Sequence, residues 1–203
     1  MSLAEQWNAR FARDDYVFGT SPTVFLREQV FCLPPKARVL AVADGEGRNG
    51  VWLAEHGCVV TSIDISTKGQ DKAARLAAAR GVDIDLRIAD LADWAWPVEH
   101  YDAVIAIFIQ FAAPALRDDI FTNIRKATRP GGRVLLQGYR PEQLDYATGG
   151  PSCAENMYTA PILRTAFGDW DIEHLVEHDS VLDEGIGHSG MSALIDMVAR
   201  KPL

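Results

Sequence analysis

A short glycine-rich segment between two apolar runs constrains the fold of this 203-residue chain more than any other feature. The first run, Val39–Ala43, ends at the loop Asp44–Asn49, and a helix-like stretch follows as far as Glu55. The second run, Val59–Asp64, ends in a carboxylate. Strand, glycine loop, helix and a strand with a terminal acid form half of a nucleoside-binding site. In such a site the glycines let the backbone approach the ligand, and the acid accepts the ribose hydroxyls.

The charge of the loop distinguishes between two kinds of cofactor. Asp44 and Glu46 place two carboxylates where the pyrophosphate of a dinucleotide would lie, and one helix N-terminus does not offset both charges. S-adenosylmethionine (SAM) has no phosphate, and its sulfonium and ammonium groups tolerate nearby acids. The loop therefore favours SAM as the cofactor, and a NAD-dependent oxidoreductase is the alternative.

Apolar runs and helical patterns continue to alternate after these two runs. Ser66 is a suitable N-cap for an alanine-rich helix that extends to Arg80. The later predicted strands are residues 84–89, 101–108, 133–138, 172–181 and 191–200, of which the last two resemble an antiparallel pair. This order predicts an α/β fold with a doubly wound, mostly parallel seven-stranded-type sheet and one antiparallel edge strand. No repeat or linker interrupts the chain, so we expect a single domain over residues 1–203.

The N-terminal residues 1–36 differ in pattern from the rest of the chain. Trp7 and Phe11 are one helical turn apart, and the segment Tyr16–Pro22 contains turn residues. We expect a helical, aromatic cap on an α/β core of residues 37–203, with the cap closing over the cofactor as a lid. The alternative is that these aromatic side chains only cover an edge of the sheet.

Composition limits the partners of the chain. The formal net charge is −8, and no cluster of lysine and arginine is present, which argues against a nucleic-acid or membrane surface. No apolar run approaches the roughly 20 residues of a membrane helix, and no apolar signal segment begins the chain, so we expect a cytoplasmic location. The histidines form no recognisable metal set, and no separate recognition domain exists. A small-molecule substrate is therefore favoured.

Several short motifs, spread over nearly the whole chain, fit one family pattern. They are Trp7 with Phe11, Tyr16–Pro22, Asp44–Asn49, Ser62–Ser66, Asp90–Leu91 with Trp94, Arg129–Gly132, Glu184–Gly185 and His188–Gly190. In these motifs the chain resembles class I SAM-dependent methyltransferases, and among them the tellurite-resistance TehB-like and thiopurine-methyltransferase-like group. The resemblance implies a Rossmann-like methyltransferase fold, SAM as the cofactor, and methylation of a small molecule.

The resemblance also implies which residues bind the cofactor. They are Asp44, Gly45, Gly47, Arg48, Asn49, Asp64, Ile65, Asp90, Leu91 and Phe108. By this likeness Gly45 and Gly47 face the methionine half of SAM, Asp64 binds the ribose, and Asp90 with Leu91 contacts the adenine. The remaining members pack on the adenine, support the loop or line the methyl-transfer face.

Three positions in or next to the loop leave alternatives open. Ala41 stands where such enzymes have an acid, and Ala43 stands where they have the first glycine of the loop. These departures make a non-catalytic SAM-binding sensor a second alternative to the enzyme. Arg48 either supports the loop and the SAM carboxylate or is a solvated residue of the first helical turn.

The acceptor side of the site has fewer motifs. The segment Phe108–Phe111 lacks the Asn/Asp-Pro-Pro-Tyr arrangement of enzymes that methylate nucleobase amino groups. The candidate substrate residues are Tyr16, Tyr139, Arg140 and His188. No acid–base pair is recognisable in the sequence, so catalytic residues stay unassigned, and we predict direct in-line methyl transfer to a soft thiol, selenium or tellurium nucleophile. A hydroxyl or amine acceptor is the alternative, and it would need His188 or Tyr139 as a base.

Overall fold

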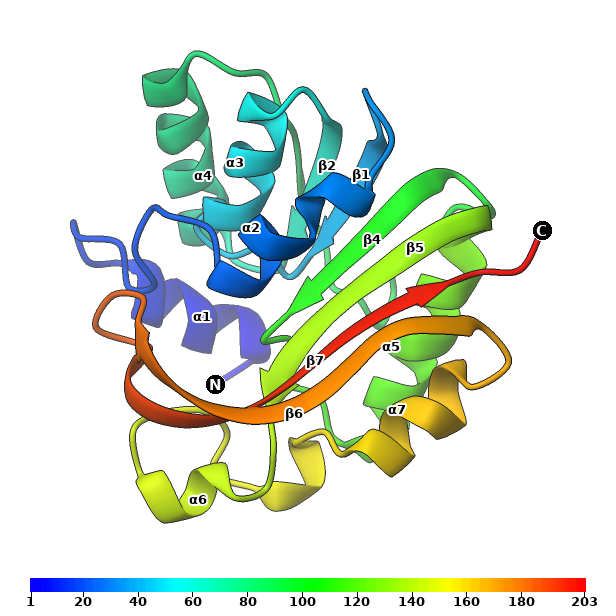
Figure 1. Ribbon diagram of the computed structural model, residues 1–203. Helices are drawn as coiled ribbons and strands as arrows, with labels where there is room; N and C mark the ends of the chain where they lie inside the picture. The colour runs from blue at the N-terminus through cyan, green and yellow to red at the C-terminus, as the bar shows by residue number, and fades with distance from the viewer.

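The computed structural model describes all residues from 1 to 203, and its central feature is one sheet of seven strands with helices on both faces (Figure 1). The strands are β1 (Arg38–Val42), β2 (Val59–Asp64), β3 (Asp85–Ile88), β4 (Tyr101–Ile107), β5 (Thr128–Tyr139), β6 (Asp171–Asp183) and β7 (Ser189–Arg200). Their order across the sheet is β3-β2-β1-β4-β5-β7-β6. Strands β1 to β5 pair in parallel, whereas β7 pairs antiparallel with both β5 and β6. The reversed strand therefore lies second from the edge, and β6 forms the edge itself.

Seven α-helices and two short 3-10 turns connect these strands. The helices are α1 (Leu3–Phe11), α2 (Val24–Gln29), α3 (Arg48–Glu55), α4 (Thr67–Arg80), α5 (Pro114–Ala127), α6 (Gln143–Tyr146) and α7 (Ala160–Phe167), and the 3-10 turns are Val30–Cys32 and Ala154–Asn156. None of the helices combines the length and the apolar character needed to cross a membrane.

The α/β fold predicted from the sequence is confirmed. Strand β2 has the predicted bounds, and Ser66 caps α4 by accepting a hydrogen bond from the backbone N–H of Gly69 at 3.0 Å. Strand β5 is longer than predicted because Thr128 already pairs with Tyr101, ahead of an irregularity in the register. The stretch between β5 and α7 contains the short helix α6 and a 3-10 turn.

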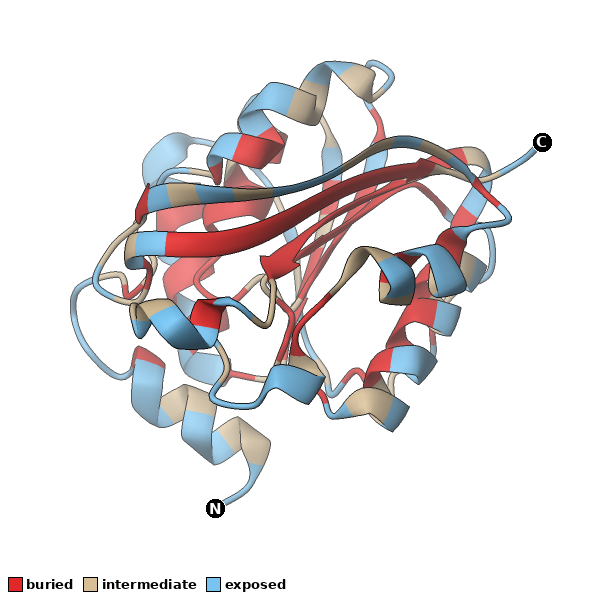
Figure 2. Ribbon diagram, turned by 60° about the horizontal axis from the view of Figure 1, so that its bottom comes forward, coloured by how far each residue is buried: buried red, intermediate tan, exposed pale blue.

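Both faces of the parallel strands are buried, because side chains point alternately to the two helical layers. On β4, Val104 packs in the cluster that includes residues of α5 and α7. Its neighbour Ala103 packs in the opposite cluster, with residues of α2 and α3. The central strands are accordingly buried along their length, whereas the edge strand β6 is mostly exposed or half-buried (Figure 2). This arrangement leaves the carboxyl ends of the parallel strands as the place for a ligand.

Helix α1 lies at these carboxyl ends, next to the start of α4 (Figure 1). The Asn8 side-chain oxygen accepts hydrogen bonds from Ser66 Oγ at 2.7 Å and from the backbone N–H of Lys68 at 3.1 Å. The ring of Phe11 approaches Gly45 so closely that a Cβ added there would lie 3.2 Å from the ring. The N-terminal cap is therefore attached both to α4 and to the glycine loop.

Candidate functional site

A cavity of about 500 Å³ lies where α1, the glycine loop and the carboxyl ends of the parallel strands meet. Eleven of the residues predicted from the sequence line it: Asp44, Gly45, Arg48, Asn49, Asp64, Ile65, Asp90, Leu91, Phe108, Tyr139 and His188. The cap contributes Leu3, Gln6, Trp7, Arg10, Phe11 and Phe18 to its wall. The cap therefore does more than cover an edge of the sheet, because it forms one side of the cavity.

Asp64, at the carboxyl end of β2, is held in place by two backbone amides. Its Oδ2 accepts a hydrogen bond from the N–H of Gly45 at 2.8 Å, and its Oδ1 accepts one from the N–H of Ser66 at 2.7 Å. Burial raises the pKa of Asp64 to about 6, in spite of these two hydrogen bonds. Because a carboxylate accepts about four hydrogen bonds, Asp64 keeps the capacity to bind a pair of hydroxyl groups.

Asp44 is the first acid after β1. Ala41, which stands where the family pattern has an acid, is buried in the core. The Asp44 carboxylate accepts hydrogen bonds from Ser62 Oγ at 2.9 Å and from the backbone N–H of Gly50 at 3.3 Å. Burial raises the pKa of Asp44 to about 7, and the charge of Asp64 acts in the same direction. A bound cation would lower both pKa values, so this acidic end of the cavity fits a positively charged ligand.

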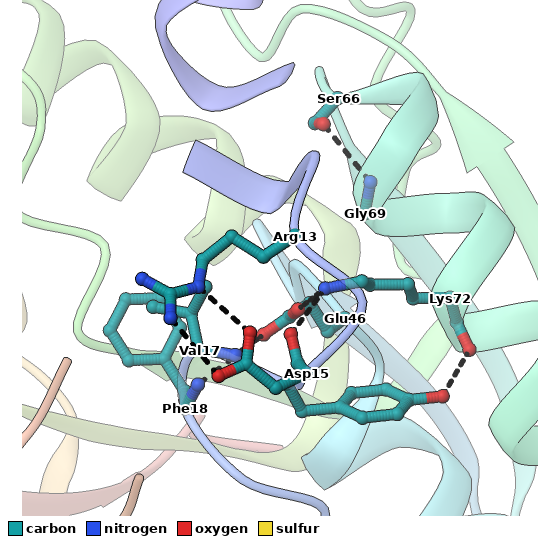
Figure 3. Close-up of polar contacts among 9 residues, drawn as sticks. Arg13, Asp15, Val17, Phe18, Glu46, Ser66, Gly69 and Lys72 are labelled. Carbon is teal, nitrogen blue, oxygen red and sulfur yellow. Dashed lines mark hydrogen bonds and ion pairs between the residues drawn. The ribbon is translucent and has the colours of Figure 1, made fainter. Parts of the chain in front are cut away.

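The position of Glu46 corrects the charge argument made from the sequence. Its Oε1 forms an ion pair with Lys72 Nζ at 2.7 Å, and its Oε2 accepts hydrogen bonds from the amides of Val17 at 2.8 Å and Phe18 at 3.3 Å (Figure 3). The side chains of Glu46 and Lys72 are only 2% and 1% exposed. Glu46 therefore fastens the cap and does not line the cavity, and of the two loop acids only Asp44 is part of the cavity wall.

The next two loop residues also bind the cap. The Arg48 guanidinium donates a hydrogen bond to the carbonyl of Phe18 at 3.0 Å and forms an ion pair with Glu184 at 2.9 Å. The Asn49 side-chain oxygen accepts a hydrogen bond from the N–H of Thr23 at 3.1 Å. Both loop residues are buried, so the interpretation of Arg48 as a solvated residue is wrong.

Three predicted site residues lie outside the cavity wall. Gly47 begins α3 with a φ of 85°, and a Cβ added there would lie 2.6 Å from the Cβ of Ala73. Tyr16 donates a hydrogen bond to a backbone carbonyl of α4 at 3.0 Å, and Arg140 forms an ion pair with Asp179. These contacts give Gly47 a packing role, Tyr16 a cap-fastening role and Arg140 a surface role, and none of the three lines the cavity.

Another part of the cavity wall, the aromatic end, is formed by the rings around His188. The His188 ring centroid lies 4.5 Å from that of Phe18, 4.4 Å from that of Phe108 and 5.7 Å from that of Tyr139. Phe108 follows β4 with a φ of 56°, a left-handed conformation that is unfavourable for a bulky side chain. Its backbone N–H donates to the carbonyl of Gln137 at 2.8 Å, which extends the β4–β5 ladder as far as this turn. The strained turn aims the Phe108 ring at the cavity.

The structure also reveals an acid–base pair that the sequence analysis missed. In the turn between β6 and β7, Glu184 Oε2 lies 3.6 Å from His188 Nδ1 and 2.9 Å from an Arg48 nitrogen. Burial alone would raise the pKa of Glu184, but His188 and Arg48 together hold it below its ordinary value. Burial lowers the pKa of His188, although Glu184 opposes this effect. In the sequence, the feature that could have indicated this pair is the four-residue spacing of Glu184 and His188 in a glycine-rich segment.

Sequence comparison identifies a known family over the first half of the sheet. Residues 39–132, which contain β1 to β4, α3 to α5 and the start of β5, match the profile of a family described as "Methyltransferase domain". No curated protein is similar enough in sequence to count as a match. The matched segment contains the glycine loop, both buried carboxylates of the acidic end, and Phe108.

Solved structures with the same fold cover nearly the whole chain. One of them, described by "Conversion of a Disulfide Bond into a Thioacetal Group during Echinomycin Biosynthesis", is 20% identical, with a TM-score of 0.78 over 99% of this chain and 92% of that chain. TehB from Haemophilus influenzae is 19% identical, with a TM-score of 0.73 over 98% of this chain and 66% of the TehB chain. Magnesium protoporphyrin IX methyltransferase (ChlM) from Synechocystis PCC 6803, solved with bound SAH, is 18% identical, with a TM-score of 0.65 over 89% and 79% of the two chains. At these sequence identities the similarity shows that this chain has the same fold as these proteins, and no more than that.

Proposed function

We propose that this methyltransferase, which uses S-adenosylmethionine, methylates a small molecule with a soft nucleophile, a thiol or a selenium or tellurium species. The methyltransferase family match does not favour the NAD-dependent oxidoreductase or the non-catalytic sensor. The sequence argument against a dinucleotide relied on the charges of both Asp44 and Glu46, but only Asp44 lines the cavity. The family match is therefore the stronger ground for SAM.

We assign the acidic end of the cavity to the cofactor. Asp64 would accept the ribose hydroxyls, Ile65, Asp90 and Leu91 would surround the adenine, and Asp44 would lie near the positively charged part. When bound, SAM supplies a methyl group activated by a sulfonium. The raised pKa values of Asp44 and Asp64 support this assignment, because a cationic ligand stabilises both residues as anions.

The enclosed aromatic end of the cavity is the observation that carries the proposed acceptor. The rings of Phe18, Phe108 and Tyr139 surround the space beside His188, and α1 covers it. A cavity of about 500 Å³ that also has to hold the cofactor leaves room only for a small acceptor. Apolar walls remove water, which favours a polarisable, weakly hydrated nucleophile that reacts once it is aligned.

The names of two structural neighbours agree with soft-nucleophile chemistry. One was described for the conversion of a disulfide bond into a thioacetal group, and the other is TehB. Both align with at least 98% of this chain, including its cap and its C-terminal strands. They support a sulfur or tellurium acceptor without identifying which one this enzyme uses.

Two measurements test the proposed function. Calorimetry with SAM, S-adenosylhomocysteine and NAD should show binding of the first two only, and Asp64→Asn should weaken SAM binding at least about tenfold. The matched control is Asp93→Asn, which changes an exposed acid outside the cavity wall and should leave affinity unchanged. A methylation screen of thiols, selenite, tellurite and small amines should then show turnover of a soft acceptor. Turnover of amines alone would contradict the proposal.

A further inference from the structure

Three buried polar groups at or beside the aromatic end of the cavity have no hydrogen-bond partner. They are Tyr139 Oη, His188 Nδ1 and Glu184 Oε2, and of these residues Tyr139 and His188, which are 2% and 6% exposed, line the cavity. Ser192 is close enough to affect the pKa of Tyr139, but the two hydroxyls make no hydrogen bond of normal geometry, and Ser192 Oγ donates to the carbonyl of Gly190 instead. His188 Nδ1 and Glu184 Oε2 face each other at 3.6 Å, so the group that indicates a ligand is the Tyr139 hydroxyl, because buried polar groups in folded proteins are nearly always paired.

We propose that His188 takes the proton of the acceptor thiol and that the Tyr139 hydroxyl donates a hydrogen bond to the resulting thiolate. This assignment rests on the proposed function and makes the two residues the acceptor subsite of the same cavity. It also revises the base-free mechanism predicted from the sequence, because the structure contains an acid–base pair.

The protonation states of the two residues suit these roles. Burial raises the pKa of Tyr139 well above its ordinary value, so the hydroxyl stays a hydrogen-bond donor. Burial lowers the pKa of His188, so at neutral pH the imidazole is uncharged and one ring nitrogen can accept a proton. The charged groups that act on His188 are Glu184 from its own turn, Arg48 from α3 and Arg10 from α1.

Glu184 is the positioning residue of this arrangement. Its carboxylate faces His188 Nδ1 at 3.6 Å, which leaves Nε2, a nitrogen without any hydrogen bond, to face the acceptor. An Arg48 nitrogen forms an ion pair with the same Glu184 oxygen at 2.9 Å. The turn itself is closed by a hydrogen bond from the Glu184 N–H to the His188 carbonyl at 2.9 Å, and the Gly187 N–H donates to the Val17 carbonyl at 2.9 Å. These contacts define the orientation of the imidazole before any ligand binds.

The chemistry of the step balances with these groups alone and the cofactor. The thiol S–H bond breaks, and its proton passes to His188 Nε2, while the Tyr139 hydroxyl holds the thiolate sulfur. The thiolate electron pair forms the new S–CH₃ bond, and the electron pair of the broken methyl–sulfonium bond stays on the departing S-adenosylhomocysteine. The imidazolium then returns its proton to solvent after product release.

A series of small thiols provides the test. Acidic aryl thiols are already ionised at the assay pH, whereas alkyl thiols are mostly protonated. We expect His188→Gln to reduce kcat/KM about 100-fold or more with alkyl thiols and less than about tenfold with acidic aryl thiols, since only the former need a base. Glu184→Gln should move the acid limb of the pH–rate profile to lower pH, because it removes the group that raises the His188 pKa. His56→Gln, at an exposed histidine, is the matched control.

A binding measurement separates this proposal from the proposed function. In the presence of S-adenosylhomocysteine no turnover occurs, and the ultraviolet absorbance of a bound aryl thiolate reports its ionisation. The wild-type protein should bind a weakly acidic aryl thiol as the thiolate, and His188→Gln and Tyr139→Phe should each lose this signal while SAM affinity, measured by calorimetry, is retained. An equal loss of rate across the thiol series, or thiolate binding unchanged in His188→Gln, would overturn the assignment. Failure of the wild-type enzyme to methylate any thiol would contradict the proposed function instead.

Discussion

The two ends of the cavity differ both in charge and in how the chain builds them. The acidic end consists of Asp44, Asp64 and Asp90, each at or within two residues of the carboxyl end of one of the first three strands. The aromatic end combines residues of the cap, the end of β4, the end of β5 and the β6–β7 turn. The acidic end is therefore specified by short local motifs and the aromatic end by the tertiary fold. In the proposed function, this difference separates the part assigned to the cofactor from the part assigned to the acceptor.

The largest expected effect comes from breaking the buried ion pair that fastens the cap to the glycine loop. Glu46→Gln leaves Lys72 buried without its carboxylate and should lower the free energy of unfolding by about 3 to 5 kcal/mol. Urea denaturation measures this loss. Glu55→Gln, which removes a more exposed ion pair with Arg80, is the control and should change stability by less than about 1 kcal/mol. Equal effects of the two substitutions would mean that the cap is not held by Glu46.

The acidic end should make the cofactor-free protein less stable as the pH rises. The pKa of Asp44 is raised from 3.8 to about 7 in the folded protein. Between these two pH values the folded protein keeps the carboxyl protonated, whereas the unfolded chain has lost the proton. The free energy of unfolding therefore falls as the pH rises through this range to about 7. The full shift corresponds to about 4 kcal/mol, and solvent in the cavity screens part of it. Asp44→Asn should therefore be about 2 kcal/mol more stable than the wild type at pH 8, with little difference at pH 4. Parallel pH–stability profiles would contradict this expectation.

Cofactor binding should respond to pH in the opposite direction. SAM carries a net positive charge, and its binding favours the ionised forms of Asp44 and Asp64, whose pKa values are about 7 and about 6. SAM affinity should therefore rise between pH 6 and pH 8, by at most about tenfold per pH unit for one proton released. Calorimetry in buffers of different ionisation enthalpy measures this proton release. The product S-adenosylhomocysteine, which lacks the sulfonium and has no net charge, should show a weaker dependence, and an equal dependence for both ligands would rule out an electrostatic origin.

The smallest expected effect concerns a departure from the family pattern within the loop. Ala43 has a φ of 48°, a left-handed conformation that costs an L-residue about 1 to 2 kcal/mol. Ala43→Gly removes this cost but adds about 0.5 to 1 kcal/mol of backbone entropy to the unfolded chain. The variant should be more stable by about 0.5 kcal/mol, as measured by thermal unfolding. Ala78→Gly, on the exposed face of α4, should have the opposite sign, and destabilisation by both substitutions would contradict the argument.

The fold and the acidic end could be predicted because their signals lie close together in the sequence. Alternating apolar runs define the strands, and parallel strands bring their carboxyl ends to one edge, so Asp44, Asp64 and Asp90 converge without further information. The left-handed turns at Gly45 and Gly47 follow from the glycine spacing as well. Each of these inferences needs only local geometry and one rule of sheet topology.

The direction of single side chains could not be predicted in the same way. Asp44 and Glu46 are two residues apart, yet one faces the cavity and the other the cap, because the turn at Gly45 separates them. The pairing of Glu184 with both Arg48 and His188 depends on the β6–β7 turn folding back against α3. No local sequence rule specifies that contact, which is why the acid–base pair emerged only from the structure.

The attachment of the cap to the glycine loop has a consequence for the rate of ligand exchange. Glu46 holds the amides of Val17 and Phe18 and the ammonium of Lys72 at the same time, so the cap cannot move away by losing one contact alone. Opening the cap would expose a buried charge and two amides in one step, so the open form is rare. The cap and the glycine loop would then open together as one unit. We therefore expect the residence time of a bound cofactor to depend on how often this single carboxylate releases its partners.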